Sequence, residues 1–557
     1  MIFKISYTSL NFILFVLATM LVYFCFPAKK YKWTVLLAAS VFFYAVAGYV
    51  YAAFILFTSL STYLIALWIE KVSTASKALL KAKKKEWDRD RKKAYKNRIK
   101  IRKRWIMTLA LVMNFGILAF LKYYNFFSGS LNDMLGVFGI GFSAPTLKLF
   151  LPLGISFYTF QSMGYIVDVY REKTPAQKNP LKLLLFVSFF PQIVQGPISI
   201  YDQLAVQLYE PHEFDFTRVK HGMELVLWGF MKKLIIADRA VAAINAVSPP
   251  IGGEITFSDA VSTYSSYNGT TLTFIILLYA VQLYADFSGG IDISRGVAQI
   301  FGIDMIDNFK RPYFSKSINE YWRRWHISLG AWMKNYIFYP IAMSNVFLTA
   351  SKKMKNSRFG KTSAGAHIAK VLPTSFASLV VFLVVGVWHG ANWKYVMFGV
   401  WNGGIIMLSI LMQPLFDSWT DKLHLKRESF GFRLFQMVRT FIVVLVGYVF
   451  DVAPDMQQAF VTIGKFFTAQ SFSGFFAQFS TLNLYGSDCL LIALGTLTIW
   501  ITSLIQEKHP DTDIRTMLDK KPFFLRAALL YIGVMSVIVF GVYGSGCNIA
   551  DFVYGGF

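Results

Sequence analysis

The chain has 557 residues, of which 55% are hydrophobic and 17% aromatic, and its mean hydropathy is +0.47. Soluble domains hold fewer apolar residues, and here the excess lies in long runs, so the composition excludes a soluble globular protein and indicates a polytopic membrane protein. The formal net charge of +25 falls mostly in loops between apolar runs, where anionic lipid headgroups and the positive-inside bias explain it without a nucleic-acid partner.

The first apolar run occupies residues 10–26 and follows a single lysine, Lys4. Because it has no small-residue cleavage site, we interpret it as a retained first span and not as a signal peptide. A helix needs roughly 20 residues to cross the hydrocarbon core of a bilayer. On that criterion, further spans are predicted at about residues 33–48, 51–70, 105–127, 148–170, 221–247, 271–286, 373–388, 395–413, 432–453, 487–505 and 525–545.

Basic residues between the spans predict the orientation of the chain in the cell membrane. Residues 81–104 contain fourteen Lys and Arg and three acidic residues, a net charge of +11, which predicts that the loop at 71–104 is cytoplasmic. The N-terminus then lies outside, and a second basic cluster at residues 352–361 marks another cytoplasmic loop. We interpret the 81–104 loop as a solvated helical hairpin; the alternative is that it docks an acidic carrier or a nucleotide donor.

Cysteine and histidine spacing gives no signal for a disulfide framework or a metal site. Cys25, Cys489 and Cys547 are the only cysteines, and no pair of histidines, or of histidine with glutamate, has the spacing of a metal-binding motif. We therefore predict no metal ligand and no bound cofactor.

An apolar run is broken at residues 189–197, which read Phe-Phe-Pro-Gln-Ile-Val-Gln-Gly-Pro. Two prolines and a glycine end a helix, and the freed carbonyls survive at membrane depth only where protein or a water-filled cavity covers them. We predict a re-entrant segment that lines a cavity and contains Gln195. An interfacial turn is the alternative.

Charged residues interrupt two other predicted spans. Asp286 precedes Phe-Ser-Gly-Gly and is predicted to end a span at a flexible turn, where its carboxylate either orients an imidazole or caps the next helix. A second charged set divides the 221–247 span and is interpreted as an interfacial edge: Lys232, Lys233, Asp238 and Arg239.

A histidine lies in the aromatic sequence Tyr-Trp-Arg-Arg-Trp-His-Ile-Ser-Leu at residues 321–329. Ser317 and Glu320 match a capping box, and bulky residues then recur at the spacing of one helix face as far as Tyr336. We therefore predict one helix with His326 on its aromatic face. The alternative is a histidine that only hydrogen-bonds a neighbouring helix.

A second histidine, His389, ends the apolar run 376–388 and is followed by Gly390, Ala391 and Asn392. Small residues allow close backbone approach and leave room beside an imidazole at a helix break. The 63 residues between His326 and His389 suffice for a loop and a returning span, so both imidazoles can lie at similar depth. Two imidazoles at membrane depth indicate proton-transfer chemistry.

Taken together, these motifs resemble the membrane-bound O-acyltransferase (MBOAT) family, and within it the branch of alginate O-acetylation membrane proteins. The similarity covers about residues 8–413 and rests on segments in consistent order: 155–160, 190–197, 229–233, 286–290, 308–313, 321–332 and 387–390. The chain departs from that branch at residues 341–345, where Ile-Ala-Met-Ser-Asn stands in place of a glycine-rich turn.

The resemblance implies an all-α polytopic membrane fold, a ring of many transmembrane helices around a thin central region with a transmembrane tunnel. It implies a catalytic core at 1–413 and a transmembrane extension of the same domain at 414–557. His389 matches the principal active-site histidine of the family, and His326 a position filled by histidine or asparagine. Residues expected to bind or orient substrate are Asn392, Asp286, Trp325, Trp388 and Gln195.

The implied activity is transfer of an acetyl group from cytoplasmic acetyl-CoA, or another thioester donor, across the membrane for O-acetylation of a cell-surface exopolysaccharide. His389 is expected to take the proton of the attacking hydroxyl, and a covalent acyl-histidine or acyl-serine intermediate stays open. Expected partners are membrane lipids and an extracytoplasmic esterase-like acetyltransferase with a serine nucleophile.

Two other functions fit part of the pattern. The same fold could transfer D-alanine from a carrier protein toward teichoic acid, although the chain length and the sequence Trp-Arg-Arg-Trp-His at residues 322–326 favour the polysaccharide branch. A transporter or flippase could use midplane histidines as a proton relay. Internal inverted repeats would indicate a transporter, and the sequence shows none.

Overall fold

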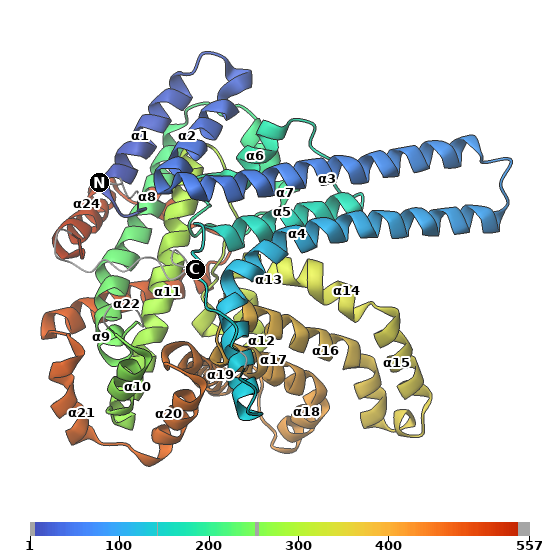
Figure 1. Cartoon of the computed structure of the whole chain (residues 1–557). Helices are drawn as coiled ribbons and strands as arrows, with labels where there is room; N and C mark the ends of the chain where they lie inside the picture. Colours follow the sequence, from blue (N-terminus) through green and yellow to red (C-terminus); the bar gives the residue numbers. More distant parts are fainter. Residues whose placement is uncertain (1–5, 142, 251–254, 544–557) are drawn as a thin grey trace. The chain divides into compact units, whose positions relative to one another are not determined.

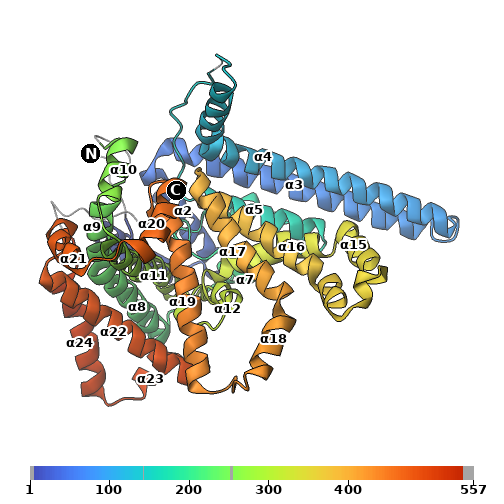
Figure 2. The same cartoon turned by 90° about the horizontal axis from the view of Figure 1, so that it is seen from below.

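The computed structural model describes residues 6–141, 143–250 and 255–543. In these ranges the structure is helical without a β-sheet, and an isolated antiparallel bridge pairs Phe309 with Trp325. Figures 1 and 2 show the helices in two views. The predicted all-α fold is therefore confirmed. The chain divides into two compact units, residues 6–226 with 291–306, and residues 227–290 with 307–543.

Eight helices in the described ranges are long and apolar enough to cross a membrane, which confirms a multi-pass membrane protein. These segments are Val50–Ala82, Arg89–Val137, Gly269–Ile300, Ser363–His389, Trp393–Leu411, Phe430–Val452, Gly486–Lys508 and Phe523–Phe540. Each contains or overlaps a span predicted from the sequence.

The first unit is built mainly from seven helices, of which two are long. They are α1 (Leu10–Cys25), α2 (Lys32–Ala47), α3 (Tyr49–Ala82), α4 (Arg89–Val137), α5 (Ile155–Tyr170), α6 (Pro180–Ser188) and α7 (Tyr201–Tyr209). Three predicted spans correspond to α1, α2 and α5, which have 16 residues each and are shorter than the roughly 20 that a span needs. Almost every side chain of α5 is buried, so this helix belongs to the protein core.

The basic loop forms a helical hairpin, as predicted. Helices α3 and α4 lie side by side and extend together as a two-helix arm (Figures 1 and 2), and only residues 83–88 connect them. At the base of this arm, Glu172 accepts hydrogen bonds from Lys103 at 2.7 Å and Ser73 at 2.8 Å and pairs with Lys77 at 2.7 Å. The two lysines, Lys103 first, hold the pKa of Glu172 down at about 2, so this junction stays charged.

The break at residues 189–197 is also confirmed. Helix α6 ends at Ser188, and the chain then runs without regular helix to Ile200, with its side chains buried up to Ser199. The carbonyls that the break frees have partners, since Tyr7 donates to Phe190 O at 3.1 Å and to Pro191 O at 2.8 Å. An exposed interfacial turn does not fit this burial.

Two long helices pass from one unit to the other, α8 (Phe216–Phe230) and α11 (Gly269–Ile300). The turn predicted after Asp286 is wrong, because α11 runs unbroken past Gly289 and Gly290. A Cβ on Gly289 would lie 2.9 Å from the carbonyl oxygen of Gly229. The glycine therefore permits close helix packing and does not form a turn.

Besides the short 3₁₀ helices η3 (Pro312–Phe314), η5 (Phe359–Lys361) and η6 (Ser480–Leu482), the second unit contains the remaining π- and α-helices. They are the π-helix η2 (Met231–Ala237), α9 (Asp238–Val247), α10 (Phe257–Ser265), α12 (Ile318–Arg324), α13 (Ile327–Met333), the π-helix η4 (Lys334–Phe338), α14 (Tyr339–Ala342), α15 (Asn345–Asn356), α16 (Ser363–His389), α17 (Trp393–Leu411), α18 (Gln413–Lys422), α19 (Phe430–Val452), α20 (Met456–Thr468), α21 (Phe472–Phe479), α22 (Gly486–Lys508), α23 (Ile514–Asp519) and α24 (Phe523–Phe540). Residue Cys547 lies outside the described ranges.

The charged residues of the 221–247 segment do not form an interfacial edge, so that prediction is wrong. The Lys233 ammonium lies 2.6 Å from Asp286 and 2.9 Å from Asp238, and all three side chains are 1% exposed. Lys232 donates to Ser288 at 2.9 Å. Burial of a charge requires a paired partner, and α11 supplies one in Asp286. These residues pair inside the protein and do not face lipid headgroups.

Candidate active site

One continuous helix was predicted around His326, but the structure interrupts it at this residue. Helix α12 ends at Arg324, and His326 has the left-handed backbone angles φ 49° and ψ 54° before α13 begins. Hydrogen bonds from the preceding segment explain the break: Lys310 N donates to Arg324 O at 2.9 Å, and Ile327 N donates to Asn308 O at 3.0 Å. These two bonds flank the antiparallel Phe309–Trp325 bridge and replace helical hydrogen bonds.

Asn308 also holds the His326 ring. Its side-chain oxygen accepts the Ser328 N–H at 2.8 Å, and its amide nitrogen lies 3.3 Å from His326 Nδ1. The bond from Ser328 fixes the orientation of the Asn308 amide, and we assign the amide N–H as the donor to Nδ1 because that contact is shorter than the 3.4 Å from the amide oxygen to Nδ1. The tautomer that follows carries its proton on Nε2, which can donate a hydrogen bond.

Aromatic rings enclose the His326 side chain, which is 2% exposed. Phe287 of α11 packs edge-on against it with ring centroids 4.8 Å apart. Trp388 of α16 lies on another side at 6.0 Å. A protonated imidazole would be poorly solvated in these surroundings, so the ring is held in its neutral form.

We expect stability to depend on pH through His326. Burial, with a smaller contribution from His389, lowers the pKa of His326 from 6.5 to about 3. Between these values the unfolded chain binds a proton that the folded protein does not, so this group lowers the stability as the pH falls, by about 1.4 kcal/mol per pH unit. Unfolding midpoints in detergent, measured from about pH 7.5 to 4.5, should fall less steeply for His326→Asn. Equal slopes would contradict the burial of a neutral imidazole.

His389 is the last residue of α16 and is partly exposed. Its ring lies between two aromatic residues of α17, with centroid distances of 4.9 Å to Phe398 and 6.2 Å to Tyr395. A Cβ on Gly390 would lie 2.3 Å from the Tyr395 ring. The small residue after His389 is therefore needed for the close approach of α17, as the sequence predicted.

Trp388 connects the two histidines. Its ring centroid lies 6.0 Å from that of His326 and 5.4 Å from that of His389. The charge of His389 also acts on the pKa of His326, so the imidazoles are electrostatic neighbours. One imidazole is enclosed and neutral while the other reaches the surface of the unit, an arrangement that suits one proton acceptor and one hydrogen-bond donor.

Comparison with known proteins places this chain in a family. A family model described as MBOAT, membrane-bound O-acyltransferase family, matches residues 175–359. The probable alginate O-acetylase AlgI of Pseudomonas putida is 32% identical over 409 residues, which are 72% of this chain and 72% of that protein. The chain belongs to the membrane-bound O-acyltransferase family.

Other relatives show how far the similarity extends. The probable alginate O-acetylase AlgI of Azotobacter vinelandii is 31% identical over 371 residues, 65% of this chain, and the chain spans 63% of the length of that relative. The peptidoglycan O-acetyltransferase of Helicobacter pylori is 27% identical over 464 residues, 78% of this chain and 73% of that protein. The MBOAT resemblance inferred from the motifs is thus confirmed.

The other predicted residues of the second unit have structural contacts of their own. Trp325 is buried and stacks on Tyr321 at 5.6 Å, next to His326 in the chain. The Asn392 side chain accepts the Lys394 N–H at 3.0 Å and caps α17, the helix that carries the rings beside His389. Asp286 pairs with Lys233, and its neighbour Phe287 contacts His326. Contact of these residues with substrate stays a prediction.

Gln195 belongs to the first unit, and the structure does not test a role for it at the histidines. Its side chain is fully buried in the non-helical segment 189–200. Among the described residues, neither end of its amide has a hydrogen-bond partner. A buried amide without partners costs about 1–3 kcal/mol, so the Gln195 amide does not stabilise this segment through hydrogen bonds.

The sequence analysis did not include two sets of residues that the structure places next to candidate site residues. Asn308 belongs to a motif that the sequence analysis quoted, but its bond to the imidazole depends on a bridge between segments that periodicity does not reveal. Lys233 and Asp238 were assigned to an interface because charges near span ends usually reach water. Their charges alone did not indicate that Lys233 pairs with Asp238 and Asp286 inside the protein.

Proposed function

We propose that this MBOAT protein transfers an acetyl group from acetyl-CoA at the cytoplasmic face to a hydroxyl group that serves O-acetylation of a cell-surface polysaccharide. The observation that supports this most directly is the pair of imidazoles whose ring centroids lie 6.0 Å and 5.4 Å from that of Trp388. Relatives named for O-acetylation of alginate and of peptidoglycan support acetyl as the group and a polysaccharide as the acceptor class.

His389 is the proposed general base. The neutral imidazole takes the proton of the attacking hydroxyl as its oxygen forms a bond to the thioester carbonyl carbon. The C–S bond then breaks, and the thiolate of CoA leaves and takes up the proton from the imidazolium. The partial exposure of His389 is consistent with access by a substrate, whereas His326 is enclosed.

His326 is the proposed hydrogen-bond donor to the oxyanion that forms on the thioester oxygen. Its Nδ1 is held by the Asn308 amide, which leaves the proton on Nε2. A donor already fixed before the reaction stabilises the developing charge without reorganisation. The low pKa of His326 fits this role, because the ring stays neutral at physiological pH.

The proposed orientation of the protein in the membrane rests on the distribution of its basic residues. The basic arm of α3 and α4 favours the cytoplasmic face by the positive-inside bias, which leaves the N-terminus outside. CoA carries phosphate groups that suit the same basic side. An extracytoplasmic esterase-like acetyltransferase with a serine nucleophile is the proposed next carrier of the acetyl group.

Membrane vesicles from cells that make the chain provide the test. With radiolabelled acetyl-CoA, label should enter a polymer fraction as an ester that mild base releases, and vesicles without the chain or with His389→Ala should lack it. Labelled D-alanine with ATP forms the parallel arm for D-alanyl transfer. Ester label from D-alanine and none from acetyl-CoA would overturn the acetyl assignment. Absence of covalent label in both arms would overturn both acetyl transfer and D-alanyl transfer as the activity.

A further inference from the structure

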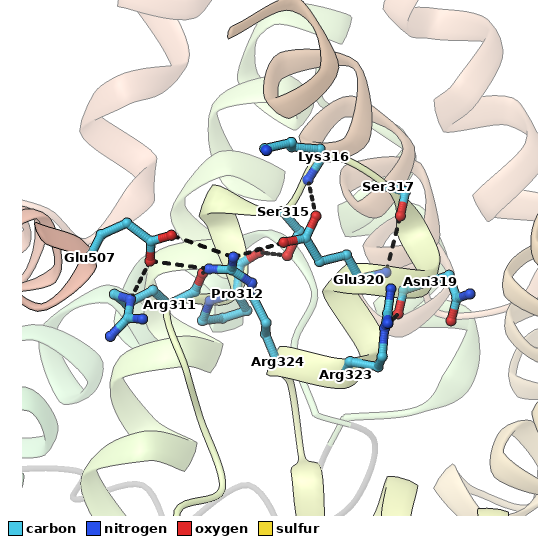
Figure 3. A network of polar contacts seen from close by, with 10 residues as sticks. All are labelled: Arg311, Pro312, Ser315, Lys316, Ser317, Asn319, Glu320, Arg323, Arg324 and Glu507. Carbon is cyan, nitrogen blue, oxygen red and sulfur yellow. Dashed lines mark hydrogen bonds and ion pairs between the residues drawn. The ribbon is translucent and has the colours of Figure 1, made fainter. Parts of the chain in front are cut away.

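Two arginines, Arg311 and Arg324, converge on one carboxylate of α22. Figure 3 shows Arg311 and Arg324 directed at Glu507. The Arg311 Nε lies 2.5 Å from Glu507 Oε2, and Arg324 Nη1 lies 3.3 Å from the same oxygen. The arginine side chains are 17% and 21% exposed and the Glu507 side chain is 39% exposed, so the two arginines are largely enclosed while water reaches the carboxylate that joins them.

The second contact of Arg324 fixes it from the other side. Its Nη2 lies 2.7 Å from Glu320 Oε1, four residues earlier on α12, and Glu320 Oε2 accepts the Lys316 N–H at 2.9 Å (Figure 3). Arg324 therefore joins α12 to α22 through two carboxylates. We call Arg311, Arg324, Glu320 and Glu507 the arginine clamp.

The clamp and His326 lie at opposite ends of one short backbone pairing. The segment 308–311 pairs antiparallel with 324–327 through the Phe309–Trp325 bridge and the two backbone hydrogen bonds beside it. Arg311 and Arg324 are at one end, and Asn308 and His326 are at the other. A displacement of either arginine must therefore pass along the pairing to the residue that holds the imidazole.

The pairing needs external support because both segments contain a strained residue. Arg311 has φ 50° and ψ 59°, and His326 has φ 49° and ψ 54°, which is the left-handed region. Residues other than glycine adopt this region at an energetic cost and persist there only where their surroundings hold them. The clamp supplies contacts at Arg311, and Asn308 supplies them at His326.

We propose that Glu507 is a positioning residue for His326, acting from the C-terminal part of the chain through the arginine clamp. Its carboxylate holds Arg311 and Arg324 together, which keeps the 308–311 and 324–327 segments in register and the Nε2 proton of His326 in place. This inference rests on the proposed function, since it assigns the clamp to the oxyanion donor of that reaction.

The test uses the full-length protein with acetyl-CoA as substrate. Glu507→Gln keeps the size of the side chain and removes its charge, and it should lower kcat about tenfold while the KM for acetyl-CoA and the melting temperature stay nearly unchanged. Glu507→Asp, which retains the charge, should recover part of the lost rate. If Glu507→Gln does not fold, the Asp variant carries the comparison.

A double-mutant cycle separates the clamp from a general loss of stability. Arg311→Gln should lower kcat to a similar extent, and the double variant with Glu507→Gln should be no worse than either alone. The matched control is Asp417→Asn, which breaks an ion pair of 2.8 Å to Arg427 elsewhere in the same unit and should leave kcat unchanged. A kcat within twofold of wild type for Glu507→Gln, or a raised KM with unchanged kcat, overturns the inference.

A second readout does not depend on activity. Diethyl pyrocarbonate modifies accessible imidazoles, and His326 is only 2% exposed, so its modification in the intact protein should be slow. Glu507→Gln should accelerate it, as measured by mass spectrometry, whereas Asp417→Asn should not. If His326→Ala retains full acetyl transfer, the proposed function fails at His326, and the modification rate alone then decides whether Glu507 positions that ring.

Discussion

Replacing His389 by alanine is expected to lower kcat for acetyl transfer about 10²–10⁴-fold, the range that a positioned acid–base group contributes. Alanine removes the proton acceptor without changing the Gly390 contact with Tyr395 that sets the spacing of α16 and α17. The KM for acetyl-CoA should change little, because the base acts on the acceptor hydroxyl in the transition state. Rates of acetyl-CoA consumption and of ester formation, measured on purified protein in vesicles, check both values.

Other histidines of the same chain provide the controls for this prediction. His509→Ala makes the same substitution at an exposed position that follows α22, and it should leave kcat within about twofold of wild type, as expected for surface substitutions. His326→Ala should reduce kcat about 10²–10³-fold, as expected for loss of one oxyanion donor. Full activity of His389→Ala would remove the proposed base and with it the mechanism.

Replacing Lys233 by methionine is expected to destabilise the protein by about 3–5 kcal/mol, because it leaves the carboxylates of Asp238 and Asp286 buried without their shared cation. Methionine fills a similar volume, so a cavity contributes little to the loss. The effect should appear as a lower unfolding midpoint in an SDS titration of mixed micelles, or as failure to recover folded protein.

Two comparisons isolate the ion pair as the cause. Lys422→Met makes the same change at an exposed position of α18 and should shift stability by no more than about 0.5 kcal/mol. Lys233→Met combined with Asp238→Asn and Asp286→Asn should recover much of the loss, since no buried charge is then left alone. A loss below about 1 kcal/mol for Lys233→Met alone would show that water reaches the cluster.

The sequence predicted the features that depend on long apolar runs and on local breakers. Spans such as 373–388 and the hairpin around residues 83–88 follow from composition, and the prolines at 191 and 197 predicted a buried break that the structure contains. The two histidines were selected because a polar, titratable imidazole is costly to bury in an apolar sequence and is therefore rare there without a function. Their common neighbour Trp388 agrees with that selection.

The predictions from sequence were wrong where contacts between distant segments override the local pattern. The helical spacing from Trp322 to Tyr336 is real, yet backbone bonds from Asn308 and Lys310 break the helix at His326. Gly289 and Gly290 suggested a turn, although in a packed helix the missing side chain makes room for a neighbour. The Lys233 cluster and the Glu507 clamp join residues more than 50 and 180 positions apart, which no local window can detect.

The length of α4 separates the N-terminal end of that helix electrically from the ion pairs of Glu172. From Lys103, which contacts Glu172, the helix α4 continues back to Arg89 for about 21 Å at 1.5 Å per residue. That distance exceeds two Debye lengths of roughly 8 Å in physiological salt. The basic residues in the first turn of α4 can therefore be lost, gained or neutralised by a counter-charge without changing the ion pairs of Glu172.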